Sequence, residues 1–476
     1  MNTDGIELRT RSASLLLVVG LLVGGVGAAP APASAQAGAG VGAGHGEDRS
    51  GSRFADGHGI HVVSARHTSA RVWKLVVRTG ALQRTVHVDL VLPRGYASGS
   101  RRYPTLYLLH GTSGGADDWI DSGRLRSATS TYPMITVLPD GGYDHNGGSF
   151  WTNWVAQHTS LGRANWETFH IRQLVPWVDA NLRTVRSRSA RAIAGLSQGG
   201  FGSMSYAARH PDLFVAAASF SGAPDIARNP AARALGGVFV GSIMTGLNGV
   251  RPNAPFGDPV TNAINWRGHN PASLVTNLAH TDLRLWTGNG EAGPLDPPGP
   301  PAPDAAAIEA VVHQSTLFFA DAADTAGVDY RLHDYGAGTH TWPYWARDLR
   351  AWLPSLRRVF ARHEPAPSVV SFRAVEHTWR QWGWRVATHR AARQAWSSLR
   401  NASRSGFTLT GGPATVTTPS YFRPGRVYRV AYRGATGPRR VTAGDGGRLR
   451  LRVEAGSARA VVRFRAADAG ARARTR

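Results

Sequence analysis

The fold is decided by residues 192–209, which read AIAGLSQGGFGSMSYAAR. Residues 192–196 are apolar or small, which is typical of a strand buried on both faces, and residues 200–209 predict a helix. Between them lies Gly195-Leu196-Ser197-Gln198-Gly199, a G-x-S-x-G pattern at a strand-to-helix turn. Glycines flank the serine in such a turn because side chains there would clash, while the hydroxyl points out of the sheet edge. Ser197 is therefore the candidate nucleophile, and the alternative is a Gly-rich structural turn.

Apolar runs alternate with longer amphipathic segments on both sides of this stretch, which predicts a parallel sheet covered by helices on both faces. Two segments with strand-like alternation come first and predict an antiparallel hairpin. Residues 227–269 fit neither period and predict an insertion over the site. The expected strands are residues 72–77, 84–92, 105–109, 135–138, 192–196, 215–220, 283–286 and 330–334, and the expected helices are residues 166–182, 200–209, 308–326 and 344–360.

The N-terminus has the pattern of a secretory signal peptide. Arg9 and Arg11 precede an apolar run over residues 15–26, and Ala33-Ser34-Ala35 then supplies a small-residue cleavage pattern. A membrane anchor is the alternative, but the run is shorter than the roughly 20 residues that span a bilayer. We expect a secreted protein, soluble or associated with the cell wall and without a transmembrane segment when mature.

Composition divides the remainder into further segments. Residues 36–71 are rich in Gly, Ala and Ser at their start, which predicts a flexible linker or N-terminal extension. A catalytic domain is expected to follow over residues 72–365. Glu364-Pro365-Ala366-Pro367 is a stiff boundary. Beyond it, alternating segments separated by Gly and Pro turns predict a small β-rich domain over residues 366–466, and residues 467–476 predict a disordered tail.

Charge and cysteine content exclude several classes of site. The sequence has no cysteine, which excludes disulfides, thiolate metal sites and a cysteine nucleophile. The formal net charge is +23, and 22 arginines against four carboxylates after Ser368 supply +18 of it. This imbalance favours attraction of the β-rich domain to an anionic polymer of the cell envelope, although Arg-rich codon use on a solvated surface explains it equally well. No motif points to a metal, nucleotide or haem cofactor, and no specific nucleic-acid partner is expected.

A serine nucleophile needs an imidazole to remove its proton and a carboxylate to orient that imidazole. In the α/β-hydrolase fold these partners follow the serine in the order acid, histidine, on loops after strands. His340 lies after the strand predicted over residues 330–334 and is the candidate base. The acid is expected after the strand predicted over residues 283–286, where Asp296 and Glu291 compete. Asp296 is preferred because its loop has the length to reach the histidine.

Two backbone N–H groups are needed to hold the oxyanion of an acyl-transfer intermediate. The candidates are Gln198, which follows the nucleophile, and Thr112 in the Gly-rich segment after residues 105–109. His110, just before that segment, is interpreted as a structural hydrogen-bonding residue. Aromatic clusters near residues 150–154 and 342–345 favour core packing for most of their members, with Trp154 and Trp342 expected to face a substrate pocket.

Together these motifs resemble the putative esterase family of the α/β-hydrolase superfamily, and within it the antigen 85-type mycolyltransferases. The similarity covers residues 72–360, in the same order throughout. The family's serine, carboxylate and histidine triad falls on Ser197, on Asp296 or Glu291, and on His340. The motifs are YLLHG at 107–111, FWTNW at 150–154, WETF at 166–169, GLS at 195–197, LW at 285–286, GNG at 288–290, GTHTW at 338–342 and YW at 344–345.

The chain departs from the mycolyltransferases at two positions that the resemblance assigns to trehalose. Those enzymes carry an aspartate before the oxyanion-loop glycine and an arginine just after it, where this chain has His110 and Ser113. The resemblance therefore implies a serine esterase or acyltransferase acting on an ester or a glycolipid-like substrate, and it does not imply trehalose as acceptor. A non-catalytic envelope-binding protein on a hydrolase scaffold is the alternative, and intact motifs argue against it.

Overall fold

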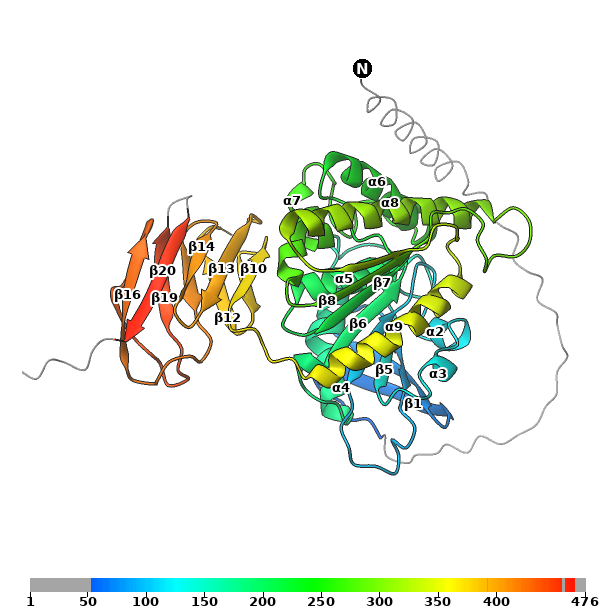
Figure 1. Cartoon of the computed structure of the whole chain (residues 1–476), viewed down its shortest axis with the longest axis horizontal. Coiled ribbons are helices and arrows are strands. Elements are labelled where there is room, and N and C mark those ends of the chain that lie inside the picture. The colour runs from blue at the N-terminus through cyan, green and yellow to red at the C-terminus, as the bar shows by residue number, and fades with distance from the viewer. Residues whose placement is uncertain (1–52, 392, 456–458, 467–476) are drawn as a thin grey trace, which may run out of the picture.

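The computed structural model describes residues 53–391, 393–455 and 459–466. Two units follow one another along the chain (Figure 1), an α/β domain and a smaller all-β domain that begins at β10 (Val370–Ala374). The predicted signal peptide over residues 1–35 and the predicted tail over residues 467–476 lie outside the described residues. No helix in the described ranges is both long and apolar enough to cross a membrane.

A nine-stranded sheet forms the centre of the first domain, in the order β1-β2-β3-β5-β4-β6-β7-β8-β9. Antiparallel pairing joins β1, β2, β3 and β5, and the strands from β5 to β9 run parallel, as the sequence predicted. The strands are β1 (Ile60–Ser69), β2 (Val72–Thr79), β3 (Val86–Val91), β4 (Thr105–Leu109), β5 (Ile135–Pro139), β6 (Arg191–Leu196), β7 (Ala216–Phe220), β8 (Asp282–Thr287) and β9 (Arg331–Asp334).

The position of β1 shows that the expected domain boundary at residues 71–72 is wrong. Its register pairs Ile60 with Thr79 and Ser69 with Val72, so it is the edge strand of the sheet. The described part of the expected linker over residues 36–71 therefore belongs to the α/β domain from Arg53 onward. The sequence pattern does not reveal β1 because it is an edge strand. Six of its ten residues are exposed, so it lacks the apolar run of a buried strand.

Helices cover both faces of this sheet. The helical segments are α2 (Asp118–Asp121), α3 (Leu125–Ala128), the π-helix η1 (Thr168–Leu174), α4 (Val175–Asn181), the 3₁₀-helix η2 (Arg188–Ala190), α5 (Gln198–Arg209), α6 (Pro230–Ser242), the π-helix η3 (Ile243–Leu247), α7 (Ala263–His269), the 3₁₀-helix η4 (Pro271–Leu278), α8 (Pro303–Ala326) and α9 (Trp342–Arg362). The insertion expected over residues 227–269 contains α6, η3 and α7.

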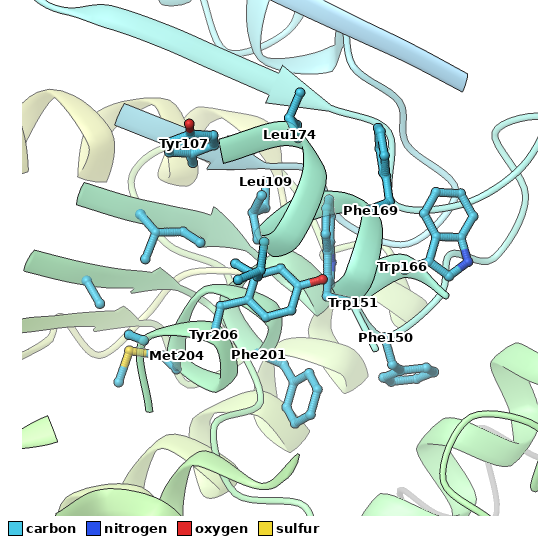
Figure 2. Close-up of a cluster of buried hydrophobic side chains, with 14 of the residues drawn as sticks. Tyr107, Leu109, Phe150, Trp151, Trp166, Phe169, Leu174, Phe201, Met204 and Tyr206 are labelled. Carbon is cyan, nitrogen blue, oxygen red and sulfur yellow. The ribbon is translucent and has the colours of Figure 1, made fainter. Parts of the chain in front are cut away.

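The alternation of side chains along each strand divides the core into two layers. In β4, Leu106 and Leu108 pack with α9, whereas Tyr107 and Leu109 pack on the opposite face with α5. Figure 2 shows part of this second layer, where Phe150, Trp151 and Phe169 gather around the α5 side chains. Burial on both faces holds the carboxyl ends of the parallel strands in fixed positions, and the loops that follow those ends carry the candidate site.

The C-terminal strands form a two-sheet sandwich with its own apolar core. One sheet has the order β10-β13-β14-β20-β16-β18 and the other β11-β12-β15-β19-β17. The remaining strands are β11 (Thr378–Gln381), β12 (Trp384–Thr388), β13 (Ser397–Ser403), β14 (Gly406–Thr410), β15 (Ala414–Thr417), β16 (Val427–Arg433), β17 (Ala435–Thr436), β18 (Arg440–Thr442), β19 (Arg450–Ala455) and β20 (Ala460–Ala466). The separate β-rich region predicted after residue 365 is confirmed.

The sandwich contacts the first domain through buried and half-buried groups. Arg209, at the end of α5, donates to Glu167 at 2.9 Å within its own domain and to Glu376 of the sandwich at 2.8 Å. Asn277 accepts from the Arg373 N–H at 2.9 Å. Gly268 lies so close to Val375 that an added Cβ would approach its side chain to 2.3 Å. These contacts fix where the sandwich lies on the α/β domain.

Candidate active site

Ser197 occupies a strained turn between β6 and α5. Its backbone has φ 52° and ψ −124°, a conformation that side-chain-bearing residues rarely adopt. A Cβ added at Gly195 would lie 2.3 Å from the Gly199 carbonyl oxygen, and one added at Gly199 would lie 2.3 Å from the His110 carbonyl oxygen. The two glycines are therefore required by close backbone contact, as the G-x-S-x-G pattern predicted.

His340 lies on the loop between β9 and α9. Its Nδ1 is 2.7 Å from Oε2 of Glu309, and its side chain is 8% exposed. Its Nε2 is buried and has no hydrogen-bond partner among the residues that the structure describes. His340 and Ser197 line the same cavity. An imidazole that is held at Nδ1 by a carboxylate, has an Nε2 unpaired among the described residues and lines the nucleophile's cavity is arranged to act as a general base.

Glu309 is fully buried in the second turn of α8, and its other oxygen is held by three donors. Oε1 accepts from the Gly288 N–H at 2.7 Å, from the Ser221 hydroxyl at 2.8 Å and from the Thr287 hydroxyl at 3.3 Å. Such donors stabilise a carboxylate that burial would otherwise disfavour. One oxygen is thus fixed by the ends of two strands, and the other is aimed at the imidazole.

The prediction that Asp296 or Glu291 is the acid that orients His340 is wrong. Asp296 accepts hydrogen bonds from the hydroxyls of Thr339 and Tyr344 and from the Gly293 N–H. Partial burial raises the pKa of Asp296, but these hydrogen bonds outweigh it, so the pKa is lowered. Glu291 is exposed and pairs with the side-chain amide of Asn289 at 3.1 Å. Neither carboxylate contacts His340. Asp296 instead braces the loop that carries the histidine.

Glu309 was missed because the acid was sought on the loop directly after β8, whereas the structure supplies it from the following helix. A signal was present in the sequence. Glu309 shares a face of α8 with Val312 and Thr316, three and seven residues further on, and that face is buried. A carboxylate inside a buried helical stripe is rare unless it is paired. The spacing alone could have marked it as a third candidate.

The predicted oxyanion donors lie beside the nucleophile. Thr112 is in the loop after β4, and Gln198 is the first residue of α5. Neither backbone N–H has an acceptor within the part of the chain that the structure describes. The Gln198 side chain donates to the Thr112 hydroxyl at 3.2 Å and to the Gly147 carbonyl at 3.0 Å, which joins the two donor segments.

Two further contacts hold the oxyanion loop. His110 Nε2 accepts from the Gly141 N–H at 2.7 Å, which leaves the proton on Nδ1 for the Gly111 carbonyl at 2.7 Å, and burial lowers the pKa of this imidazole. Asp140 accepts from the Ala116 N–H at 2.9 Å. His110 is thus a structural hydrogen-bonding residue, as the sequence analysis expected.

A cavity of about 680 Å³ opens above Ser197 and His340. One wall comes from the insertion and is mainly apolar, with Phe239, Ile243 and Leu247. Trp342 and Trp345 form another wall, so Trp342 lies where it was predicted. Asp118 and Asp304 add two carboxylates to the lining.

The prediction for Trp154 is wrong. Its side chain is 4% exposed and does not line this cavity, and its indole N–H donates to the Ser149 carbonyl at 3.0 Å. A tryptophan whose one polar atom is already satisfied in the core has no group left for a substrate. Among the described residues no cluster of three or more His, Asp or Glu side chains is placed to hold a metal ion.

Comparison with known families places the chain among the esterases. A family model described as "Putative esterase" matches residues 79–356. The chain belongs to this esterase family. The diacylglycerol acyltransferase/mycolyltransferase Ag85B of Mycobacterium leprae is 30% identical over 292 residues, which cover 60% of this chain and 82% of that relative. The solved structure of MPT51 (FbpC1) from Mycobacterium tuberculosis has a TM-score of 0.50 at 24% identity, covering 61% of this chain and all of that one.

Another relative, Esterase Rv1288 of Mycobacterium tuberculosis, is 38% identical over 180 residues. That match covers 37% of each chain, so this chain spans only about a third of that relative. The comparisons confirm the resemblance to this family and to its antigen 85 branch. They also confirm the α/β-hydrolase fold and the assignment to a family of ester hydrolases and acyltransferases.

Proposed function

We propose that the chain is a secreted serine esterase or acyltransferase that works through an acyl-serine intermediate. One observation carries the proposal. Ser197, with its strained backbone, and His340 line one cavity, and Nδ1 of that histidine is 2.7 Å from the buried carboxylate of Glu309. Nucleophile, acid and base, which are Ser197, Glu309 and His340, follow one another along the chain in the order typical of the fold.

In the first half of the reaction, Ser197 Oγ attacks the ester carbonyl while His340 Nε2 takes the hydroxyl proton. Glu309 keeps the remaining imidazole proton on Nδ1 and stabilises the imidazolium. The Thr112 and Gln198 N–H groups donate to the oxyanion. Collapse of the tetrahedral intermediate breaks the bond to the leaving alcohol, which receives the proton from His340. The acyl group is then bonded to Ser197.

In the second half, an acceptor hydroxyl attacks the acyl-serine, and His340 removes its proton. The acceptor is water in hydrolysis and a carbohydrate hydroxyl in transfer. The second intermediate collapses with return of the proton to Ser197 Oγ, which restores the enzyme. The apolar wall of Phe239, Ile243 and Leu247 suits an acyl chain, and Trp342 contributes to the pocket for the ester.

Replacement of the nucleophile tests this proposal. Ser197→Ala is expected to abolish turnover of a short-chain nitrophenyl ester, because the hydroxyl supplies the covalent step and little packing. Circular dichroism and thermal denaturation should match the parent. Full turnover by a folded Ser197→Ala protein would overturn the mechanism.

Two parts of the proposal concern location and partners. The signal-peptide pattern of residues 1–35 supports export of the chain to the extracellular side. The excess of arginine after Ser368 supports attraction of the C-terminal sandwich to an anionic polymer of the cell envelope. A cell fractionation that finds the mature protein only in the cytoplasm would refute both the export and the contact with an envelope polymer.

A further inference from the structure

The C-terminal sandwich has a groove of its own, away from the catalytic cavity. Its volume is about 900 Å³, and no residue that lines it also lines the cavity above Ser197. The lining comes from the two residues before β10, the β13–β14 turn, the segment that leads into β16 and the end of β20. Segments far apart in the sequence thus meet around one concave surface.

Four arginines line this groove, namely Arg404, Arg423, Arg426 and Arg465, and all are exposed. Within the described ranges none of the four forms an ion pair with a carboxylate. Among the described residues that line the groove, none is acidic. Within the part of the chain that the structure describes, positive charge is therefore concentrated there without a counter-charge, and a bound anion would supply one.

The rim also offers neutral hydrogen-bonding groups. Arg404 donates to the Tyr421 carbonyl at 3.1 Å, which fixes its guanidinium at the edge of the groove. Ser368, Ser405 and Ser420 add hydroxyls to the lining. Guanidinium forks match the two oxygens of a carboxylate or the oxygens of a phosphate, and hydroxyls can pair with sugar hydroxyls between such groups.

We propose that this groove binds a polyanionic glycan, a carbohydrate polymer with carboxylate or phosphate groups at intervals along its chain. The proposal deepens the attraction to an anionic polymer proposed above, because it assigns that attraction to one surface and four residues. It does not depend on the catalytic mechanism. The groove residues hold the polymer, and Ser197 acts independently.

The aromatic residues of the groove favour a glycan over single-stranded nucleic acid. Phe422, Tyr428 and Phe464 line it but are buried, so among the described lining residues only the half-buried Tyr421 presents part of a ring. Proteins that bind single strands stack successive bases on exposed aromatic rings. This groove has arginines and hydroxyls where such a surface would need several exposed rings.

A charge-matched pair of variants of the full-length protein tests the proposal. In the groove variant Arg404, Arg423, Arg426 and Arg465 are changed to Gln. In the control variant the same change is made at Arg385, Arg400, Arg433 and Arg450, which are exposed arginines of the same sandwich outside the groove. Both variants lose four charges. Near-UV circular dichroism and nitrophenyl-ester turnover should match the parent in both, because neither set touches the catalytic cavity.

Binding is measured on polygalacturonate, dextran phosphate, unmodified dextran and a 20-nucleotide thymidine strand, at low salt and at about 0.5 M salt, where screening acts over a few ångström. The groove variant should lose at least about tenfold in affinity for polygalacturonate or dextran phosphate, and the control variant less than about threefold. Whichever polymer shows the larger loss identifies carboxylate or phosphate as the recognised group. Equal losses in the two variants, or no binding of either polymer by the parent, would overturn the proposal. Tighter, groove-dependent binding of the thymidine strand would assign the groove to nucleic acid instead.

Discussion

Glu309→Gln perturbs the triad with almost no change in volume. Oε1 of Glu309 accepts from three donors, and Oε2 lies 2.7 Å from His340 Nδ1. A glutamine places its oxygen among those donors and therefore turns its NH₂ group toward Nδ1. Since two donors cannot share that position, the imidazole proton moves to Nε2. His340 can then no longer accept the proton of Ser197.

The expected loss is about 10⁴-fold in kcat, the size of the effect when a neutral residue replaces the acid of a serine protease triad. That corresponds to about 5 kcal/mol of transition-state stabilisation. The matched control is Asp296→Asn, which removes a charge that braces the loop without contact to His340 and should cost less than about tenfold. Steady-state hydrolysis of a nitrophenyl ester, with thermal denaturation of each variant, gives both values. A Glu309→Gln enzyme within tenfold of the parent, together with a much slower Asp296→Asn enzyme, would refute the assignment.

Three other perturbations test the surroundings of the site. Gly199→Ala should destabilise the fold by about 1–3 kcal/mol, because its Cβ would lie 2.3 Å from a backbone oxygen, and an unchanged melting temperature would show that the turn tolerates a side chain. Asp140→Asn should lower kcat roughly tenfold with KM little changed, because Asp140 holds the oxyanion loop in place and does not contact the substrate. A change in KM alone would show that Asp140 acts in substrate binding instead. Burial lowers the pKa of His170 to about 3 and of His269 to about 4, against an ordinary 6.5. As the pH falls, the unfolded chain therefore binds protons at these histidines before the folded chain does. The free energy of unfolding, measured by urea denaturation, should fall as pH drops below about 6.5, by up to about 1.4 kcal/mol per pH unit for each histidine. A free energy of unfolding that stays constant down to about pH 4 would contradict this.

The strands and the nucleophile could be predicted because their signals are local. A strand buried on both faces is a run of apolar residues, and a nucleophile elbow needs glycines at fixed positions around one serine. These features follow from steric limits that act over a few residues, so Ser197 and the strands around it lie where the sequence places them.

The acid could not be placed in the same way because it depends on three-dimensional packing. Asp296 and Glu309 are separated by 13 positions, and both lie after β8 and before His340. Which one reaches the imidazole depends on how α8 packs against the ends of β7 and β8, and spacing carries no such information. Trp154 was misplaced for a related reason, since a tryptophan looks the same in the sequence whether it lines a pocket or the core.

The edge strand β1 and the groove of the sandwich show a further limit. An edge strand has one neighbour and few buried positions, so its alternation is weak. Net charge identified the sandwich as basic, but the gathering of four arginines from the β13–β14 turn, the segment before β16 and β20 depends on strand order, which the sequence pattern does not specify.

The central claim is that Ser197 forms a covalent acyl intermediate, and active-site labelling tests it most directly. The parent protein is incubated with a fluorophosphonate, and the modified peptide is identified by mass spectrometry while ester turnover is followed in the same samples. The mechanism predicts one adduct per chain, on Ser197, formed in step with the loss of turnover and strongly slowed in Glu309→Gln. Turnover that continues after Ser197 is fully labelled, or loss of turnover with the adduct on another residue, would contradict the mechanism.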